Sequence, residues 1–314
     1  MPGLGSLLVL FQFYRFVSEN RYVSHSSEVA VVKMKFNPTK LFRKKKRFQL
    51  SASVDGEKAG FIRPPSNKVQ RKDSLISGIF IPENGQLYEG FSITEDDVVL
   101  DVGCGDGCIA LFAAGRRAKK VIATDVDPKN VEFTKKKLAS YNRTRDFEVH
   151  LSDSNPLPLA NNTATKVICR EVLEHVDDPV AIMKELVRVG TPDASFLITV
   201  PDPVGEKLQQ GIAPDAYWEK PNHVRIFERE EFAQLLEQAG LVVEQRQSHG
   251  FYWSMWWVLF WAAGQELGEP EKPILGHWTS VWNELISTPK GEEIKVALDE
   301  FMPKSQVLIA KKAA

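Results

Sequence analysis

A glycine-rich stretch and an acid that follows the next apolar run are the residues best suited to chemistry in this chain. Gly103, Gly105 and Gly107 alternate directly after Asp101. Glycine lets a backbone turn sharply and approach a ligand closely, and a helix that begins after such a turn offers unpaired N–H groups. Asp125 ends the next apolar run, where a carboxylate can accept hydrogen bonds from both hydroxyls of a ribose. This combination predicts a nucleoside site.

The spacing of the glycines argues against a dinucleotide as the ligand. The dinucleotide fingerprint is G-x-G-x-x-G, whereas here the glycines alternate and Cys108 follows Gly107. A pyrophosphate cradle is therefore disfavoured. The alternative, that these are turn glycines and a helix-flanking acid without a ligand, is also disfavoured because glycine spacing, strand context and acid placement agree.

Strand patterns alternate with helical patterns from about residue 95 onward, and this alternation must position the loop and the acid. The expected strands are 98–102, 121–124, 147–151, 165–169, 195–200, 241–246 and 306–310. The expected helices are 108–118, 128–141, 179–189 and 228–239. Such alternation is typical of βαβ units. The sequence therefore predicts an α/β fold, a Rossmann-like, mostly parallel sheet of seven strands with helices on both faces.

Composition narrows the function classes. The 314 residues include 40 basic and 41 acidic side chains, so a nucleic-acid partner is not expected. A hydrophobic share of 43% and a charged share of 26% exclude disorder, collagen and coiled coil. The three cysteines, Cys104, Cys108 and Cys169, cannot form a disulfide framework. We therefore expect a reducing, cytoplasmic location.

Five short motifs resemble the class I S-adenosylmethionine-dependent methyltransferases of small-molecule type. They are DVGCGDG at 101–107, ATDVDP at 123–128, SDSNPLPL at 152–159, REVLEHVDDP at 170–179 and PNHVRIF at 221–227. The resemblance covers roughly residues 95–250 and the last strand. It implies S-adenosylmethionine as the cofactor and S-adenosylhomocysteine as its product, and it says little about the acceptor.

The resemblance also implies which residues hold the cofactor. By position they are Asp101, Gly103, Cys104, Gly105, Gly107, Asp125, Val126, Asp153, Ser154, Arg170 and Glu171. The loop residues would hold the methionine part and the ribose, and Asp125 would bind the ribose hydroxyls. Asp153, with Ser154 beside it, would meet the adenine edge. Val126 and Leu157 would enclose the adenine faces.

Arg170 and Glu171, at the end of the fourth strand, would lie beside the methionine moiety. This class usually carries a small or apolar residue near Arg170, so the chain departs from the pattern there. Glu171 and His175 have an alternative role, which is to support the start of the following helix.

Histidines supply the candidate bases. Methyl transfer from a sulfonium chiefly requires in-line alignment, and a hydroxyl acceptor also benefits from a base near its proton. His223 follows the fifth strand, at the edge where open α/β sheets bind ligands. Its alternative role is to tie this loop to the core. His249, after the sixth strand, is a second candidate.

Two other chemistries are disfavoured. No cluster of carboxylates predicts a metal, so no metal is expected and metal-assisted methylation of catechol type is disfavoured. No Asn-Pro-Pro-aromatic stretch follows the fourth strand, which disfavours methylation of the exocyclic amine of adenine.

An aromatic-rich insert, expected to be helical and to span 250–304, separates the sixth and seventh strands. It holds every tryptophan of the chain except Trp218. Such aromatics can form a helical core, line an apolar or sugar-stacking pocket, or make an interface or a shallow membrane contact. The substrate candidates are Trp253, Trp257 and His277 in the insert, with Tyr88 ahead of the first strand.

Residues 1–94 are expected to be an N-terminal extension to a catalytic domain at 95–314. Met34 resembles a natural start, so 1–33 is interpreted as an upstream segment. The basic run at 40–47 either contacts anionic lipid or a phosphorylated substrate, or is a solvated tail. The segment 74–90 is a candidate lid over the site.

The sequence thus favours methylation of a small-molecule acceptor, on a hydroxyl oxygen of an apolar or glycan-like metabolite, with His223 as base. Two alternatives stay open. One is methylation of a lipid-linked or membrane-associated acceptor, and the other is a methyltransferase-like binding protein without activity. The sequence does not predict an oligomeric state.

Overall fold

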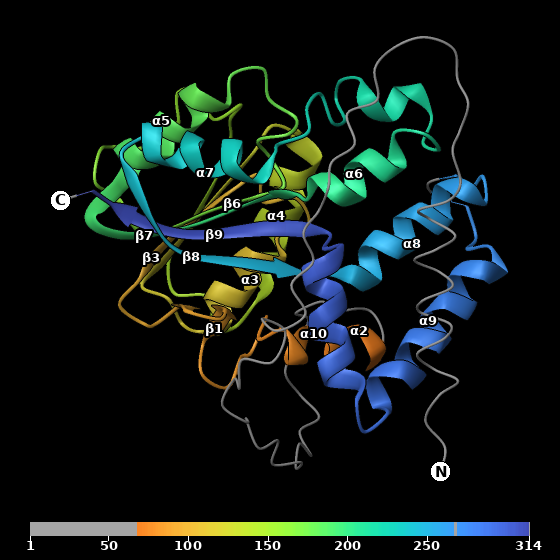
Figure 1. The fold of residues 1–314 in the computed structure, drawn as a ribbon. Coiled ribbons are helices and arrows are strands. Elements are labelled where there is room, and N and C mark those ends of the chain that lie inside the picture. The colour runs from red at the N-terminus through yellow and green to blue at the C-terminus, as the bar shows by residue number, and fades with distance from the viewer. Residues whose placement is uncertain (1–67, 267–268, 314) are drawn as a thin grey trace, which may run out of the picture. The chain divides into compact units, whose positions relative to one another are not determined.

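The computed structural model describes residues 68–266 and 269–313. The expectations for 1–33 and for the basic run at 40–47 lie outside the described residues. The described part is built on one seven-stranded sheet (Figure 1). Its strands are β3 Val98–Val102, β4 Lys120–Asp125, β5 Phe147–Leu151, β6 Ala164–Arg170, β7 Gly190–Pro201, β8 Leu241–His249 and β9 Ser305–Lys312.

The sheet has the strand order β5-β4-β3-β6-β7-β9-β8. The neighbours from β5 to β7 pair in parallel, and β9 runs antiparallel to both β7 and β8. The chain crosses from β5 back to β6 beside β3, which places a topological switch point between β3 and β6. Ligands of open α/β sheets bind at the carboxyl ends of the strands near such a point.

Helices cover both faces of the sheet. They are α3 Cys108–Gly115, α4 Pro128–Ser140, α5 Pro179–Val189 and α7 Arg229–Gln238. Leu100 of β3 packs in the cluster that holds the buried side chains of α5 and α7. Val99, its neighbour in the strand, packs in the cluster of α3 and α4, because successive strand residues face opposite sides. The predicted fold class is confirmed.

Element ends differ from the predictions by a few residues. The helix expected at 108–118 ends at Gly115, because Arg117 adopts a positive φ of 58° that a helix cannot continue. Strand β7 is longer than the expected 195–200 and begins at Gly190, which pairs with Ala164.

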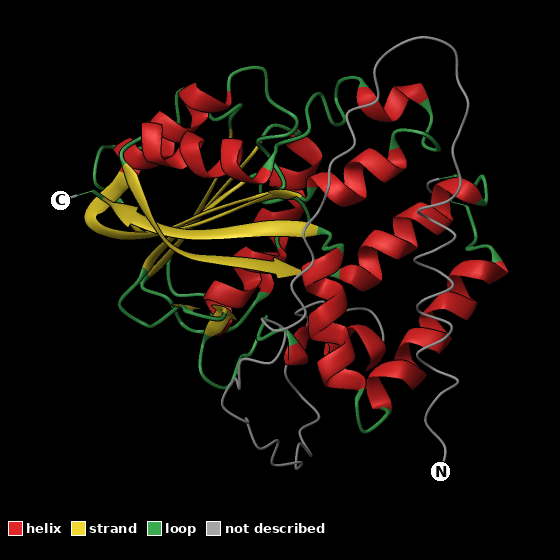
Figure 2. Cartoon of the chain, viewed as in Figure 1, coloured by secondary structure: helices red, strands yellow, loops and turns green. Residues whose placement is uncertain are grey.

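The insert between β8 and β9 is helical, as predicted. It contains α8 Phe251–Ala262, α9 Pro273–Ser287 and α10 Gly291–Phe301, and it packs with α2 Lys68–Ile76. Figure 2 shows these helices grouped at the end of the sheet toward which β8 points. That end carries the carboxyl termini of the parallel strands.

A buried polar network joins α2 to the insert. The Trp282 indole Nε1 donates to Asp73 Oδ1 at 2.8 Å. The Lys295 ammonium donates to Ser77 Oγ at 2.7 Å and forms an ion pair with Asp299. The insert and the segment before the sheet are therefore packed as one body within the described residues.

The candidate lid segment includes a small hairpin of β1 Gln86–Tyr88 and β2 Phe91–Ser92. Leu87, Tyr88, Phe91 and Ile93 are buried in the same cluster as α3. The hairpin thus contributes side chains to the core of the sheet.

Among the helices of the described residues, none combines the length and the apolar character that crossing a membrane requires.

Candidate active site

The three positions after β3 require glycine for different structural reasons. All three have positive φ, at 69° for Gly103, 50° for Gly105 and 76° for Gly107. A Cβ at Gly103 would lie 2.3 Å from Val172 Cγ2, and one at Gly107 would lie 2.7 Å from Thr134 Oγ1. A Cβ at Gly105 would meet nothing within 4 Å. The outer glycines therefore permit packing, and the central one faces the open space that a ligand would fill.

A Gly103→Ala substitution is expected to destabilise the protein by about 2–4 kcal/mol. The new methyl group would overlap Val172, and an L-residue at positive φ is strained. Urea unfolding followed by circular dichroism measures this difference. Gly276→Ala in α9 is the matched control, because its Cβ meets nothing within 4 Å and alanine favours a helix. Equal stabilities of the two variants would contradict this account of the loop.

Asp125 fastens the glycine loop to the end of β4. Its Oδ2 accepts a hydrogen bond from the Gly105 backbone N–H at 2.8 Å. Its Oδ1 accepts from the Asp127 backbone N–H at 2.9 Å and from Asn130 Nδ2 at 3.2 Å. A carboxylate offers about four acceptor positions, so these three donors leave room for a ligand hydroxyl. Asp127 in turn caps α4 through the Lys129 N–H.

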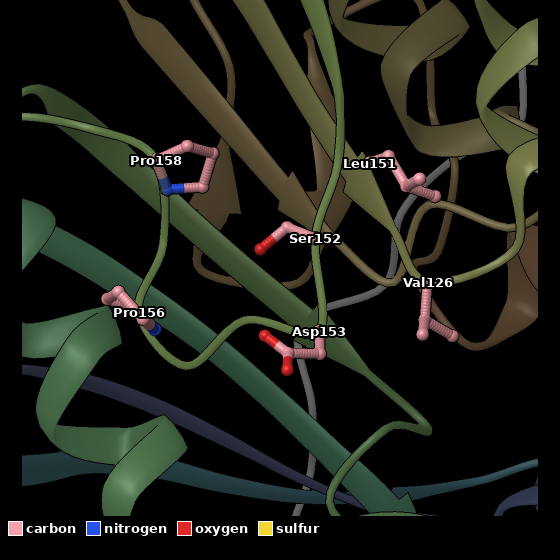
Figure 3. Close-up of a pocket in the computed structure, with 6 residues that line it drawn as sticks. All are labelled: Val126, Leu151, Ser152, Asp153, Pro156 and Pro158. Carbon is pink, nitrogen blue, oxygen red and sulfur yellow. The ribbon is translucent and has the colours of Figure 1, made fainter.

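A pocket of about 430 Å³ is lined in part by Val126, the residue that follows Asp125 (Figure 3). Its lining residues are Val126, Leu151, Ser152, Asp153, Pro156 and Pro158. Figure 3 shows Val126 and Leu151 on one side and the two prolines on the other. Val126 is 71% exposed and Leu151 is 60% exposed. Contact with a flat, apolar ligand surface would remove these exposed apolar side chains from water, which is energetically favourable.

Two residues predicted to contact the adenine, Ser154 and Leu157, are not among those that line this pocket. Leu157 is only 2% exposed and packs in the core, while its neighbours Pro156 and Pro158 line the pocket. Ser154 is buried with a φ of 67°, and its backbone N–H donates to Ser152 Oγ at 2.9 Å. In this loop of bends and turns, neighbouring residues face different sides, which the motif alone does not reveal.

Asp101 and Arg170 keep unused hydrogen-bonding atoms beside the loop. Asp101 Oδ2 and Arg170 Nε are both buried without a hydrogen-bond partner. Burial raises the pKa of Asp101 to about 7, against the opposing effect of Arg170. The Arg170 guanidinium lies 5.7 Å from the Phe80 ring centroid and 5.5 Å from that of Tyr88. A carboxyl oxygen that can accept a hydrogen bond and a guanidinium N–H that can donate one suit the ammonium and the carboxylate of an amino-acid ligand.

Cys104 and Glu171 are the remaining predicted cofactor residues. The Cys104 side chain is buried, with Sγ 3.7 Å from Thr134 Oγ1, and burial raises the pKa of its thiol to about 12. Glu171 accepts hydrogen bonds from Thr199 Oγ1 at 2.8 Å and from Lys304 Nζ at 2.9 Å. Burial alone would raise the pKa of Glu171, but the Lys304 ammonium holds it below its usual value.

The start of α5 is capped by neither of the residues named for that role. The Asp178 side chain accepts the Ala181 N–H at 2.9 Å and caps the helix. Glu171 instead ties the loop after β6 to Lys304, directly ahead of β9. The His175 Nδ1 lies 3.1 Å from the Pro221 carbonyl oxygen.

His223 lies in a buried arrangement at the same end of the sheet. It follows α6 Pro203–Gln209 and the short 3-10 helix η2 Asp215–Trp218. Its Nδ1 lies 2.6 Å from Glu206 Oε2. Its backbone N–H donates to the Tyr217 carbonyl at 3.2 Å, and the next N–H, that of Val224, donates to the Glu174 carbonyl at 2.9 Å. Two loops distant in sequence are thereby held together.

Two residues of the loop after β6, Glu174 and His175, lie against His223. The ring centroids of His175 and His223 are 4.9 Å apart. One ligand atom from each of the three residues lies within 4.8 Å of the others. From the sequence, no metal was expected and Glu174 had no predicted role. The spacing E-x-x-E-H after a buried strand was a signal that could have drawn attention to it.

Two further aromatic rings, those of Tyr217 and Trp218, lie near His223. The Tyr217 ring centroid is 4.7 Å from that of His223 and 5.1 Å from that of Trp261 in α8. The Trp261 Nε1 donates to Gln209 Oε1 at 3.0 Å. Trp257, a predicted substrate contact, stacks on Trp261 at 5.8 Å. From the sequence, Tyr217 had no predicted role, and Trp261 was placed in the aromatic insert without a site role.

The contacts of the other predicted site residues involve different partners. His249 Nε2 lies 2.9 Å from Gln247 Oε1, and its ring lies 5.9 Å from that of buried Tyr88. Trp253 contacts Tyr252 and Trp256 within the insert. His277 is exposed on α9.

A family model described as a methyltransferase domain matches residues 79–246, which is more than half of the chain. The chain is 25% identical over 162 residues to a methyltransferase, GfsG, of Streptomyces halstedii, covering 50% of this chain and 56% of that protein. It is 35% identical over 96 residues to a ubiquinone biosynthesis O-methyltransferase of Neisseria meningitidis, covering 30% of this chain and 40% of that protein. The chain spans about half the length of the curated relatives it matches.

Among solved structures, a SAM-dependent methyltransferase from Aquifex aeolicus is 25% identical. It matches with a TM-score of 0.43 and covers 59% of this chain and 93% of that one.

Proposed function

Since the chain belongs to the class I S-adenosylmethionine-dependent methyltransferases, we propose that it methylates a small-molecule acceptor. One observation carries this proposal. The Asp125-anchored glycine loop with its pocket and the buried His223–Glu206 pair both follow carboxyl ends of the same sheet. A cofactor site and an acceptor site are thus built on one rigid frame.

The residues of the first site fit the cofactor part by part. The sulfonium of S-adenosylmethionine supplies an electrophilic methyl group. The slot between Val126 and the prolines accommodates a flat base, and Asp125 offers an acceptor to a ribose hydroxyl. Asp101 and Arg170 have the spare atoms that the amino-acid end requires. Alignment of donor and acceptor by these residues is the main contribution to catalysis.

We assign the acceptor atom to a hydroxyl oxygen and the base to His223. The carboxylate of Glu206 accepts a hydrogen bond from Nδ1–H, which leaves Nε2 as the nitrogen able to receive a proton. The rings of Tyr217 and Trp218 beside His223 favour an apolar or glycan-like acceptor. The O-methyltransferase among the relatives supports oxygen, over less than a third of the chain.

The proposal places this chemistry in the domain 95–314, with the insert 250–304 as an acceptor wall through Trp257 and Trp261. The three free cysteines support a reducing compartment such as the cytoplasm.

Transfer of a labelled methyl group tests the proposal. Full-length protein is incubated with S-adenosylmethionine carrying a deuterated methyl group and with a small-molecule extract, and the products are analysed by mass spectrometry. We expect a labelled small molecule whose acid hydrolysis behaves as that of an ether or ester. Absence of any labelled product together with retained cofactor binding would instead identify a binding protein without activity.

A lipid-linked acceptor is the second candidate, favoured by the basic run at 40–47 and the tryptophans of the insert. Our proposal predicts that the full chain stays in the supernatant when it is sedimented with vesicles, with or without anionic lipid. Co-sedimentation that requires anionic lipid and decreases with salt would replace the proposal by this alternative.

A further inference from the structure

Glu174 is a buried carboxyl group without a hydrogen-bond partner. It is 1% exposed, and neither of its side-chain oxygens has a partner. The nearest ring nitrogen, His175 Nε2, is 3.7 Å from Oε1. A buried polar group without a partner is costly, and natural proteins keep such groups where a ligand completes them.

The two histidines beside Glu174 are both held by their Nδ1 atoms. His223 Nδ1 lies 2.6 Å from the Glu206 carboxylate, and His175 Nδ1 lies 3.1 Å from the Pro221 carbonyl oxygen. Both partners are acceptors, so each Nδ1 carries the proton and each Nε2 keeps its lone pair. Histidines that bind metals in proteins are held in this way, with the second nitrogen donating to a carboxylate or a backbone carbonyl.

The positions and charges of the group suit a small cation. One ligand atom from each of Glu174, His175 and His223 lies within 4.8 Å of the others. Donors around a transition metal, with bonds of about 2.0–2.2 Å, are separated by about 3–4 Å, which small side-chain adjustments reach. The Lys304 ammonium gives its hydrogen bond to Glu171. The carboxyl groups of Glu171 and Glu206 repel a negative charge on Glu174, and the Lys304 ammonium offsets part of this repulsion.

From these three observations we infer that Glu174, His175 and His223 bind a divalent transition-metal cation. Two imidazole nitrogens and one carboxylate oxygen suit Zn²⁺, Mn²⁺, Fe²⁺ or Co²⁺ better than Mg²⁺, which prefers oxygen ligands. Three protein ligands leave coordination positions for water or for an oxygen atom of another molecule. Glu206 is then a positioning residue that orients His223.

This inference deepens the proposed function and rests on it for the role of the cation. At the acceptor side of the sheet, the open positions would hold and orient an acceptor oxygen. One nitrogen cannot bind a cation and receive a proton at once. With the cation bound, His223 Nε2 is a ligand, and the free base described above is the form without the cation.

Calorimetric titration of chelator-treated, full-length protein with Zn²⁺, Mn²⁺ and Mg²⁺, each alone, tests the site. We expect one equivalent of Zn²⁺ or Mn²⁺ to bind, and Mg²⁺ to bind far more weakly. Glu174→Gln and His175→Ala should each weaken binding by about 100-fold or more, and Glu206→Gln by about 10–100-fold. The absorption spectrum of bound Co²⁺ should indicate mixed nitrogen and oxygen ligands and should disappear in both ligand variants.

His150→Ala is the matched control, because His150 also pairs with a glutamate, Glu148 at 3.0 Å, on the distant strand β5. It should bind the cation as the wild type does. His175 is partly exposed, so its variant keeps the test valid if Glu174→Gln fails to fold. No binding by the wild type, or equal binding by both ligand variants, would overturn the inference.

A second calorimetric titration, of the cation-free protein with S-adenosylmethionine, separates this inference from the proposed function. Binding of S-adenosylmethionine by the cation-free protein, together with no cation binding, would overturn this inference and leave the proposed function standing. Cation binding without cofactor binding would overturn the proposed function alone.

Discussion

An Asp125→Ala variant is expected to bind S-adenosylmethionine at least about 100-fold more weakly than the wild type. The carboxylate holds the Gly105 and Asp127 N–H groups and offers an acceptor to a ribose hydroxyl. Its removal therefore frees the loop and deletes a charged hydrogen bond to the ligand, a bond worth about 1.5–3 kcal/mol. Isothermal titration calorimetry measures the two affinities directly.

Asp106→Asn is the matched control for this substitution. Asp106 lies in the same loop, but its side chain is half-exposed. It accepts a hydrogen bond from the Cys108 N–H at 3.2 Å and forms a long ion pair with Lys137 at 3.9 Å. Its effect on cofactor affinity should stay within about threefold, as for an exposed ion pair. Similar losses in both variants would contradict a specific role of Asp125 and indicate a general charge effect.

A His223→Ala variant is expected to lose about 10²–10⁴-fold in kcat while its cofactor affinity stays within about twofold. The loss corresponds to the contribution of a positioned general base. The cofactor affinity is retained because the His223 partners are Glu206 and Tyr217, which are not residues of the loop or of the Val126 pocket. Steady-state methyl transfer, with cofactor affinity measured separately, gives both quantities.

Two further variants test this prediction more closely. Glu206→Gln keeps the shape of the side chain but holds the imidazole less firmly, so its kcat should fall by less than that of His223→Ala. His150→Ala, on β5, should have the turnover of the wild type. An unchanged kcat in His223→Ala would remove this histidine from the mechanism.

The cofactor side of the site could be anticipated because its signals are local. Glycines 103, 105 and 107 and Asp125 come from one βαβ unit, and a short stretch of sequence records both the turn and the acid. The hydrogen bond from Gly105 to Asp125 follows from that proximity. The sequence of an irregular loop does not indicate which side chains face the pocket. Leu157 was therefore expected to contact the adenine, whereas Pro156 and Pro158 line the pocket.

The acceptor side depends on contacts between segments distant in the chain. Glu206 comes from α6, His175 from the loop after β6, and Lys304 from the end of the insert. No periodicity in any one segment predicts that these three side chains are brought to the same end of the sheet. The E-x-x-E-H spacing becomes meaningful only once the 215–225 segment is placed against it by the hydrogen bond from Val224 to Glu174.

The insert shows an intermediate case. Its helical character was predicted, and a packed aromatic core was one of three alternatives left open; Trp282 and Tyr252 do form a buried core. The hydrogen bond from Trp282 to Asp73 joins the insert to a helix that precedes the first strand, and no local pattern indicates it.

A crystal structure of the protein with S-adenosylhomocysteine tests the central claim most directly. The account predicts adenine in the pocket between Val126 and the two prolines, the ribose next to Asp125, and the amino-acid end near Asp101 and Arg170. The product's sulfur should then face the side of the sheet that carries His223. A ligand bound elsewhere, or no ligand at saturating concentration, would contradict it.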